Sequence, residues 1–106
     1  MKAFDNFFWH DGNLIDVKFS IDKKGRSSLQ ITALFYESED ASDRRMYQIT
    51  AGEALRFSCS LDAAQLKENA FAGNIWNGYL KENVLWMYCT DGVIEVHAKK
   101  FKLEKC

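Results

Sequence analysis

Alternation of apolar and polar residues with a period of two is the feature that most constrains how this chain folds. Three stretches show it, at 14–22, 29–36 and 55–61. Successive side chains of a β-strand point to opposite faces of a sheet, so each stretch predicts a strand with one face in the core. The residues expected to face inward are Ile15, Val17, Phe19 and Ile21, then Leu29, Ile31, Ala33 and Phe35, then Leu55, Phe57, Cys59 and Leu61.

Two Asp-Gly pairs, at 11–12 and 91–92, lie between apolar runs and predict β-hairpins. We expect each glycine to take the positive φ that a type I′ turn requires, while aspartate tolerates such a turn. The surrounding segments, 7–19 and 87–96, share one order of aromatic, Asp-Gly, aliphatic, acidic and valine residues. Either this similarity between the two segments arises by chance, or the first and last strands pair with each other and close a barrel.

Other local signals place the remaining turns and one helix. The segments 23–26 and 51–53 predict turns, the first with Gly25 in a left-handed conformation. Asp62 and Gln65 resemble a capping box, which predicts a helix of about two turns from that point. The segment 4–8 fits a strand or a single helical turn equally.

The later strands carry two irregularities. Gly78 lies within the strand expected at 75–81, where it marks a bulge or a close approach. Phe101 and Leu103 fall out of phase with the preceding alternation, which predicts a bulge near Lys99 and Lys100. Together these patterns predict a mainly β fold, an antiparallel sandwich or partly open barrel of seven to eight strands with one short helix. Residues 1–106 are expected to form a single domain.

The charge balance and the cysteines limit the expected partners and cellular location. The net charge of −1 provides no overall field for nucleic acid or an anionic membrane, so we expect neither as a partner. No apolar run approaches the roughly 18 residues of a membrane span. Three cysteines without a CxxC pair are typical of a reduced, cytoplasmic protein. No cofactor or metal is expected, because Cys59, Cys89, His10 and His97 lack paired spacing.

Catalytic and charged motifs all have simpler structural interpretations. His10 and Asp11, beside Trp9, form a candidate acid and base pair, but an Asp-Gly turn is the favoured explanation and no enzyme is predicted. Cys59 is expected to be a small buried apolar residue. The C-terminal lysines at 99, 100, 102 and 105 are interpreted as protection of an edge strand. The acidic stretch 37–45 is an exposed loop with partner binding as the alternative.

A surplus of aromatic residues is the strongest functional signal. In the strand expected at 84–89, Leu85 and Met87 share one face, and Trp86 and Tyr88 share the other. Either both faces are covered, or one is an exposed patch that binds a protein or a second copy in a homodimer. The candidate partner-binding residues are Trp9, Tyr36, Trp76, Trp86 and Tyr88. The alternative function is a barrel that holds a small apolar ligand, lined by Phe19, Phe35 and Phe57.

One segment resembles a group of known proteins. The run FWHDGNLIDV at 8–17 is similar to the opening of small bacterial β-rich proteins of uncharacterised function. Some of these resemble immunity proteins, which neutralise a partner toxin. The resemblance implies a bacterial, non-enzymatic binding protein and no catalytic residue.

Overall fold

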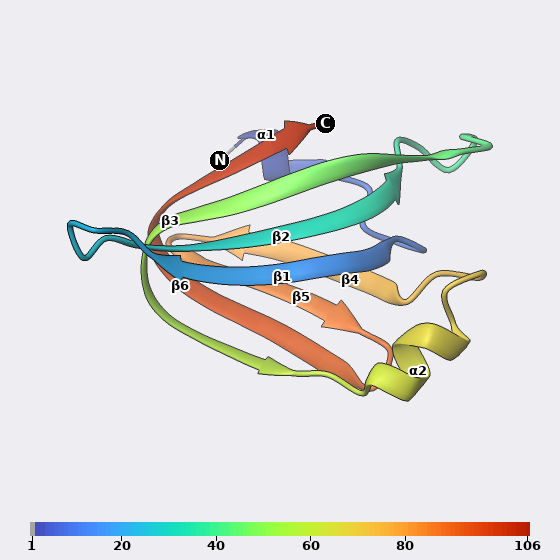
Figure 1. Ribbon diagram of the computed structural model, residues 1–106. Helices are drawn as coiled ribbons and strands as arrows, with labels where there is room; N and C mark the ends of the chain where they lie inside the picture. The colour runs from blue at the N-terminus through green and yellow to red at the C-terminus, as the bar shows by residue number, and fades with distance from the viewer. Residues whose placement is uncertain (1) are drawn as a thin grey trace.

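A single antiparallel sheet makes up most of the molecule (Figure 1). The structure is a computed structural model that describes residues 2–106, and within that range six strands follow the order β1-β2-β3-β6-β5-β4. The elements are α1 (Lys2–Asp5), β1 (Asn13–Ile21), β2 (Ser27–Tyr36), β3 (Arg44–Ser60), α2 (Ala63–Glu68), β4 (Ile75–Lys81), β5 (Val84–Cys89) and β6 (Gly92–Lys105). The mainly β class is therefore confirmed.

The expected number of strands is wrong because β3 does not break where a turn was predicted. Gly52 is paired on both sides, with β2 and with β6, so the strand continues through it. Glu53 then takes a positive φ of 51°, and the register with β6 shifts between Ala54 and Arg56. The shift is a β-bulge, which bends a strand without ending it. The phase change expected on β6 is present, but the extra residue lies on β3.

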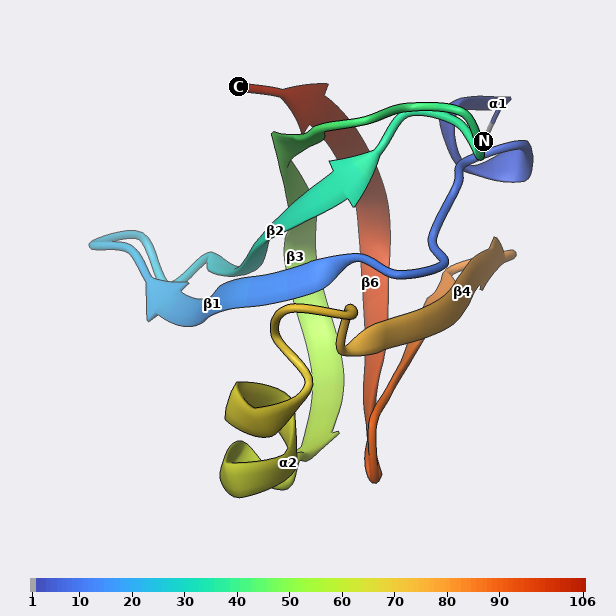
Figure 2. The same cartoon turned by 90° about the vertical axis from the view of Figure 1, so that its right-hand side faces the viewer.

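The bend folds the sheet over on itself. In Figures 1 and 2, β1, β2 and the first part of β3 face β4, β5 and the first part of β6 across the interior. The two edge strands meet again at an isolated bridge between Gly12 and Ile75. The proposed pairing of the first and last strands is wrong, since β6 lies between β3 and β5.

A buried asparagine holds the meeting point of the two edges. Asn74 is the one buried polar residue among those that the structure describes. Its side-chain oxygen accepts from the Leu14 amide at 2.8 Å, and its Nδ2 donates to the Leu66 carbonyl at 2.9 Å. These bonds tie β1 and α2 to the residue just before β4. Polar groups buried in this way must be hydrogen-bonded, so the contact also fixes the register of the junction.

Of the two Asp-Gly pairs, one closes a hairpin and the other does not. The hairpin between β5 and β6 is confirmed, whereas the segment before Asp11 turns inward without forming a strand. In both pairs the aspartate takes the positive φ, 65° at Asp11 and 53° at Asp91, so the expected role of the glycines is wrong. Position 12 has room only for glycine, because a Cβ there would lie 2.5 Å from the Phe35 ring.

The predicted helix and the first hairpin are both confirmed. Asp62 caps α2 by accepting from the Gln65 amide at 3.1 Å. The hairpin of β1 and β2 turns through Gly25, whose φ is 80°. The N-terminal segment, which fitted two structures, forms the short helix α1. No helix in residues 2–106 is long and apolar enough to cross a bilayer.

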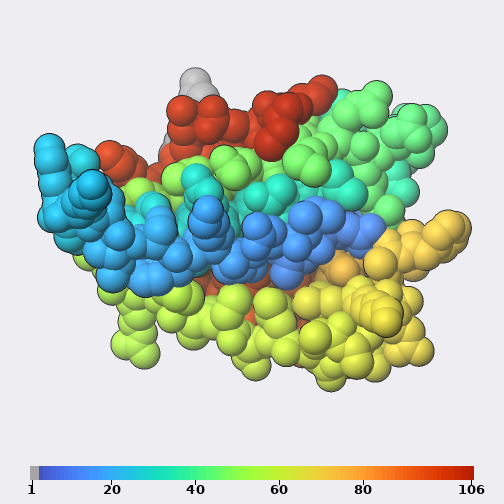
Figure 3. All heavy atoms as spheres, in the orientation of Figure 1, coloured from blue at the N-terminus to red at the C-terminus, as the bar shows by residue number. Residues whose placement is uncertain are grey.

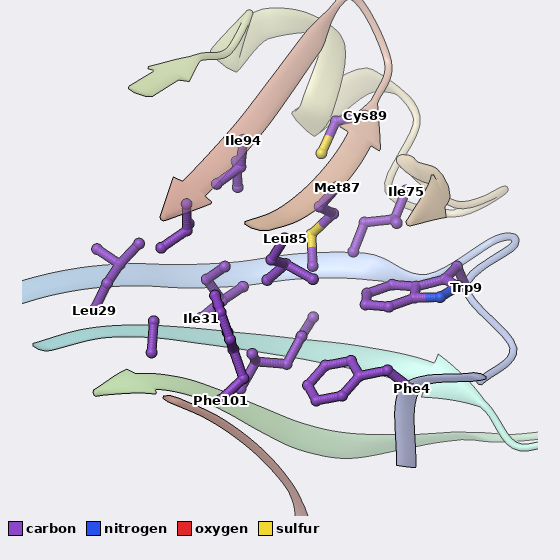
Figure 4. Close-up of a cluster of buried hydrophobic side chains, with 14 of the residues drawn as sticks. Phe4, Trp9, Leu29, Ile31, Ile75, Leu85, Met87, Cys89, Ile94 and Phe101 are labelled. Carbon is purple, nitrogen blue, oxygen red and sulfur yellow. The ribbon is translucent and has the colours of Figure 1, made fainter. Parts of the chain in front are cut away.

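The core is filled by the inner faces of the central strands (Figure 4). All four β2 residues expected to face inward are buried. The inward positions expected of Ile15 and Leu55 are wrong, because each is the extra residue at a bulge, and Leu14 and Ala54 pack against the core instead. Phe19 and Phe57 are in phase with the core but largely uncovered, because they border the opening between the two halves. Phe19 and Phe57 meet across it, with ring centroids 5.1 Å apart, and both remain partly exposed. Cys59 is exposed as well, so its expected burial is wrong.

Candidate functional site

The outer face of β4 and β5 presents several aromatic side chains, and β6 borders it. Leu85 and Met87 of β5 are fully buried, which directs the alternate residues Trp86 and Tyr88 outward. Tyr79 of β4 is the cross-strand partner of Trp86. We call the surface formed by Trp76, Tyr79, Trp86 and Tyr88 the outer aromatic face.

The rings of this face are arranged in near-parallel pairs. The Tyr79 and Trp86 centroids lie 4.9 Å apart at an interplanar angle of 29°, and those of Tyr79 and Tyr88 lie 6.2 Å apart at 29°. Trp76 lies at a bulge at the start of β4 and is 61% exposed. Its Nε1 donates to Oγ1 of Thr90 at 3.0 Å. Cross-strand contacts of this kind hold aromatic rings in fixed orientations on a sheet.

A carboxylate on β6 anchors the central indole. Glu95 accepts from Trp86 Nε1 at 2.8 Å through one oxygen and contacts His97 Nε2 at 2.8 Å through the other. The hydrogen bond from His97, and then that from Trp86, lower the pKa of Glu95 below its ordinary value. Hydrogen bonding with Tyr79 raises the pKa of Tyr88 above its ordinary value. The face therefore combines stacked aromatic rings with a carboxylate whose hydrogen bonds fix its orientation.

The structure brings together three of the five candidate residues from the sequence, Trp76, Trp86 and Tyr88. Trp9 is only 5% exposed and belongs to the core, where its ring lies 5.7 Å from that of Phe35. Tyr36 lies at the end of β2, in the other half of the sheet, with the Arg44 guanidinium 4.6 Å above its ring.

Two residues of the face were not among the candidates. Tyr79 was not singled out as a candidate, although Asn77 and Tyr79 alternate in phase with the outward positions of β4. Glu95 was given no role. The predicted Asp91-Gly92 hairpin was the signal that could have found it, because the pairing of β5 with β6 places Glu95 opposite Trp86.

The other chemical candidates occupy ordinary structural positions. His10 Nε2 and Asp11 Oδ1 are 3.6 Å apart on an exposed turn. The Gly12 amide donates to the Trp9 carbonyl at 3.2 Å and closes a turn through His10 and Asp11, while the Asp11 amide donates to the Ile75 carbonyl at 3.0 Å. Burial raises the pKa of the Cys89 thiol to about 11, so this thiol stays protonated. Within residues 2–106, no group of three or more His, Cys, Asp or Glu side chains is placed to hold a metal ion.

The three phenylalanines proposed to line a ligand cavity do not surround a common space. Phe35 is completely buried and packs edge-on against Phe7, with centroids 4.8 Å apart. Phe19 and Phe57 are in contact with each other at the opening. The interior near these residues is occupied by their own rings.

Comparison of the chain with models of protein families, with curated proteins and with solved structures found no match. The function of the chain is therefore inferred from the geometry of the molecule.

Proposed function

We propose that this protein is a non-enzymatic binding module that attaches to a protein partner through the outer aromatic face. The observation that carries the proposal is the exposure of Trp76, Tyr79 and Tyr88 around the half-buried Trp86. Trp and Tyr are enriched among the residues that dominate protein interfaces, where they provide large, rigid contact area. Core packing does not require these side chains, since Leu85 and Met87 fill the interior from the same strand.

Polar groups around the rings favour a specific interface over nonspecific hydrophobic association. Asn77 and Thr90 lie at one end of the face, and Glu95 and His97 lie along its β6 side. Interfaces commonly have such a polar rim around an apolar centre. The hydrogen bond to Glu95 and the stacking on Tyr79 hold the Trp86 ring in place before binding. Preorganised side chains lose less entropy on association, which increases affinity.

An immunity-like role is the form of this proposal that the resemblance of residues 8–17 favours. In that role the partner is a toxin protein, and the chain is bacterial and cytoplasmic. Self-association through the same face is the alternative, since aromatic residues also anchor homodimers. No geometric feature favours the apolar-ligand function, because Phe19, Phe35 and Phe57 do not line a common cavity.

The test uses one double variant, Trp76→Ala/Trp86→Ala, and one matched control, Phe71→Ala. Phe71 is 96% exposed on a loop outside the outer aromatic face, so its removal deletes surface aromatic area without touching that face. Sedimentation velocity first measures self-association of the three proteins. Capture from the native host followed by calorimetry with the purified partner then measures binding to another protein.

The proposal predicts that the double variant stays folded and binds the partner, or itself, at least about 100-fold more weakly, since each lost aromatic anchor costs on the order of 2 kcal/mol. The control is expected to bind like the wild type. Equal loss in the control would indicate nonspecific hydrophobic contact. Unfolding of the double variant would show that the two tryptophans are core residues and would remove the basis of the proposal.

A further inference from the structure

We propose that one end of the molecule docks onto an anionic lipid surface. The docking surface, which we call the basic corner, is formed by the β1–β2 turn, the bulge of β3 and the adjoining part of β6. Its residues are Ile21, Lys23, Lys24, Arg26, Leu55, Lys99 and Lys100. This surface is separate from the outer aromatic face, and the inference does not rest on the proposed function.

Segments distant in the sequence supply the positive charge of the basic corner. A hollow of about 450 Å³ is lined by Ile21, Arg26 and Lys100 among others, and an adjoining one of about 220 Å³ by Arg26, Leu55 and Lys99. Figure 3 shows the β1–β2 turn projecting at this end of the molecule. The three segments therefore form one continuous surface.

Acidic side chains neutralise only part of this charge. Asp22 pairs with Arg26 at 3.0 Å, and Glu53 lies 4.0 Å from Lys100. Lys23, Lys24 and Lys99 have no carboxylate partner within salt-bridge distance in the described residues. The basic corner is thus positive although the whole chain carries a net charge of −1.

The most acidic segment lies at the other end of the molecule from the basic corner. The 37–43 loop lies opposite the β1–β2 turn (Figure 1), and Arg45 and Lys105 neutralise only Glu37 within it. The sequence-based expectation of no membrane partner used the total charge, which conceals this separation. An anionic surface attracts basic segments within a Debye length, and it would orient the molecule with the β1–β2 turn toward the lipid.

Two aliphatic side chains project among these cations. Ile21 is 62% exposed and Leu55 is 65% exposed, and both belong to the alternating sets that the sequence predicted to be covered. Leu55 is the extra residue of the β3 bulge, so no residue of β6 is paired opposite it. Apolar side chains surrounded by lysines match the layered chemistry of a lipid interface, with acyl chains below anionic headgroups.

Lipid is favoured over nucleic acid by the kind of apolar residue present. Proteins that bind single strands place aromatic rings beside a basic groove so that bases stack on them. Ile21 and Leu55 offer no flat ring, and Phe101 on the neighbouring strand is buried. The partly exposed rings nearest along β1 and β3, Phe19 and Phe57, pack against each other with centroids 5.1 Å apart. The last part of β6 is an edge of the sheet, and protection of that edge explains Lys102 and Lys105 without any ligand. It does not explain the exposed side chains of Ile21 and Leu55.

Vesicle cosedimentation of the full chain tests the inference. Vesicles of phosphatidylcholine alone are compared with vesicles of phosphatidylcholine and phosphatidylserine at about 3:1, a ratio that gives an anionic surface. Binding is expected only to the second kind. It should fall more than tenfold when NaCl rises from about 0.1 M to about 1 M, because the Debye length shrinks from about 10 Å to about 3 Å.

Two variants separate the two parts of the docking surface. Lys23→Gln/Lys24→Gln should weaken binding roughly 30-fold, since each lysine near an anionic surface contributes about fivefold. Ile21→Ser/Leu55→Ser should weaken it by at least about tenfold through lost apolar contact. The matched controls, Arg45→Gln/Lys67→Gln and Phe71→Ser, remove exposed charge and exposed apolar area elsewhere and should bind like the wild type.

Several outcomes would overturn the inference. No binding to the anionic vesicles is the simplest of them. Binding that the controls weaken as much as the variants would assign the effect to general charge or hydrophobicity. Tighter binding to a single-stranded oligonucleotide, unchanged in Ile21→Ser/Leu55→Ser, would identify the basic corner as a nucleic-acid surface. Urea unfolding of every variant confirms that the folded protein is being compared.

Discussion

Two groups of aromatic residues lie on opposite sides of β4, and they serve different purposes. The inner aromatic cluster, formed by Phe4, Phe7, Trp9, Phe35 and Tyr47, packs beneath the sheet through edge-on and stacked contacts. The outer aromatic face contains only Trp and Tyr, and the rings of Tyr79, Trp86 and Tyr88 lie side by side in near-parallel pairs on the surface. The contrast shows that aromatic content alone does not separate a core from a binding surface. The deciding property is whether another part of the chain covers the rings.

Gly78 shows how the inner cluster is covered. A Cβ at this position would lie 2.7 Å from the Trp9 ring, so the indole lies directly against the β4 backbone. On its other side Trp9 contacts Phe7, with centroids 5.0 Å apart. Trp86 has no backbone packed against its ring, which stacks on Tyr79 while its Nε1 donates to Glu95. Stability should therefore depend strongly on Trp9 and weakly on Trp86.

The largest expected effect comes from Trp9→Ala. Removing this buried indole leaves a cavity among Phe4, Phe7 and Phe35, and we expect the free energy of unfolding to fall by about 3 to 5 kcal/mol. Urea denaturation measures the change. A loss similar to that of Trp86→Ala would contradict the distinction between the two groups.

Gly78→Ala should have the next largest effect, a loss of about 1 to 3 kcal/mol, because the new methyl group overlaps the Trp9 ring. A double-mutant cycle sharpens this prediction. In the Trp9→Ala background the cost of Gly78→Ala should fall below about 1 kcal/mol, since the obstructing ring is gone. Additive costs would show that the glycine is needed for another reason.

On the outer aromatic face, the expected effects on stability are smaller. Trp86→Ala should lower the free energy of unfolding by about 1 kcal/mol, through the lost hydrogen bond to Glu95 and the lost stacking on Tyr79. Trp76→Ala should change it by less than about 0.5 kcal/mol, as is usual for an exposed position. Chemical denaturation of both variants beside Trp9→Ala gives the order directly, and a reversed order would place these residues in the core.

The smallest effect concerns the acid titration of Glu95. Its folded-state pKa is lowered below 4.5, first by the hydrogen bond from His97 and then by that from Trp86. Its contribution to stability is therefore present above pH 4.5 and is lost as the pH falls through the folded pKa. In urea unfolding at pH 7 and at successive values below 4.5, Glu95→Gln should lose less stability than the wild type. Identical pH profiles would show that this carboxylate is not engaged as described.

Local patterns were sufficient for the elements that depend on local chemistry. The hairpin of β1 and β2 follows from period-two alternation and Gly25, and α2 follows from the Asp62 cap. The phase of β5, with Leu85 and Met87 inside, follows from the same alternation. These features need only neighbouring residues, so they are visible in the sequence.

Features that depend on distant contacts were not predictable. The segment around Gly52 has the composition of a turn, and it stays extended because β2 and β6 pair with it from both sides. Phe19 is in phase with the core, yet the fold of the sheet leaves it partly exposed, and the bulge of β3 displaces Leu55 from the predicted alternation. Trp9 lies in a segment with no clear period, so its burial is visible only once its ring is seen against the backbone of Gly78.

Whether the outer aromatic face is the binding surface is decided by the affinity of the Trp76→Ala/Trp86→Ala variant for the partner captured by the wild-type protein, or for itself. We expect the variant to have a free energy of unfolding within about 1.5 kcal/mol of the wild type and an affinity at least about 100-fold weaker. The Phe71→Ala control should match the wild type in both quantities. A double variant that binds as tightly as the wild type would contradict the claim that the outer aromatic face is the binding surface.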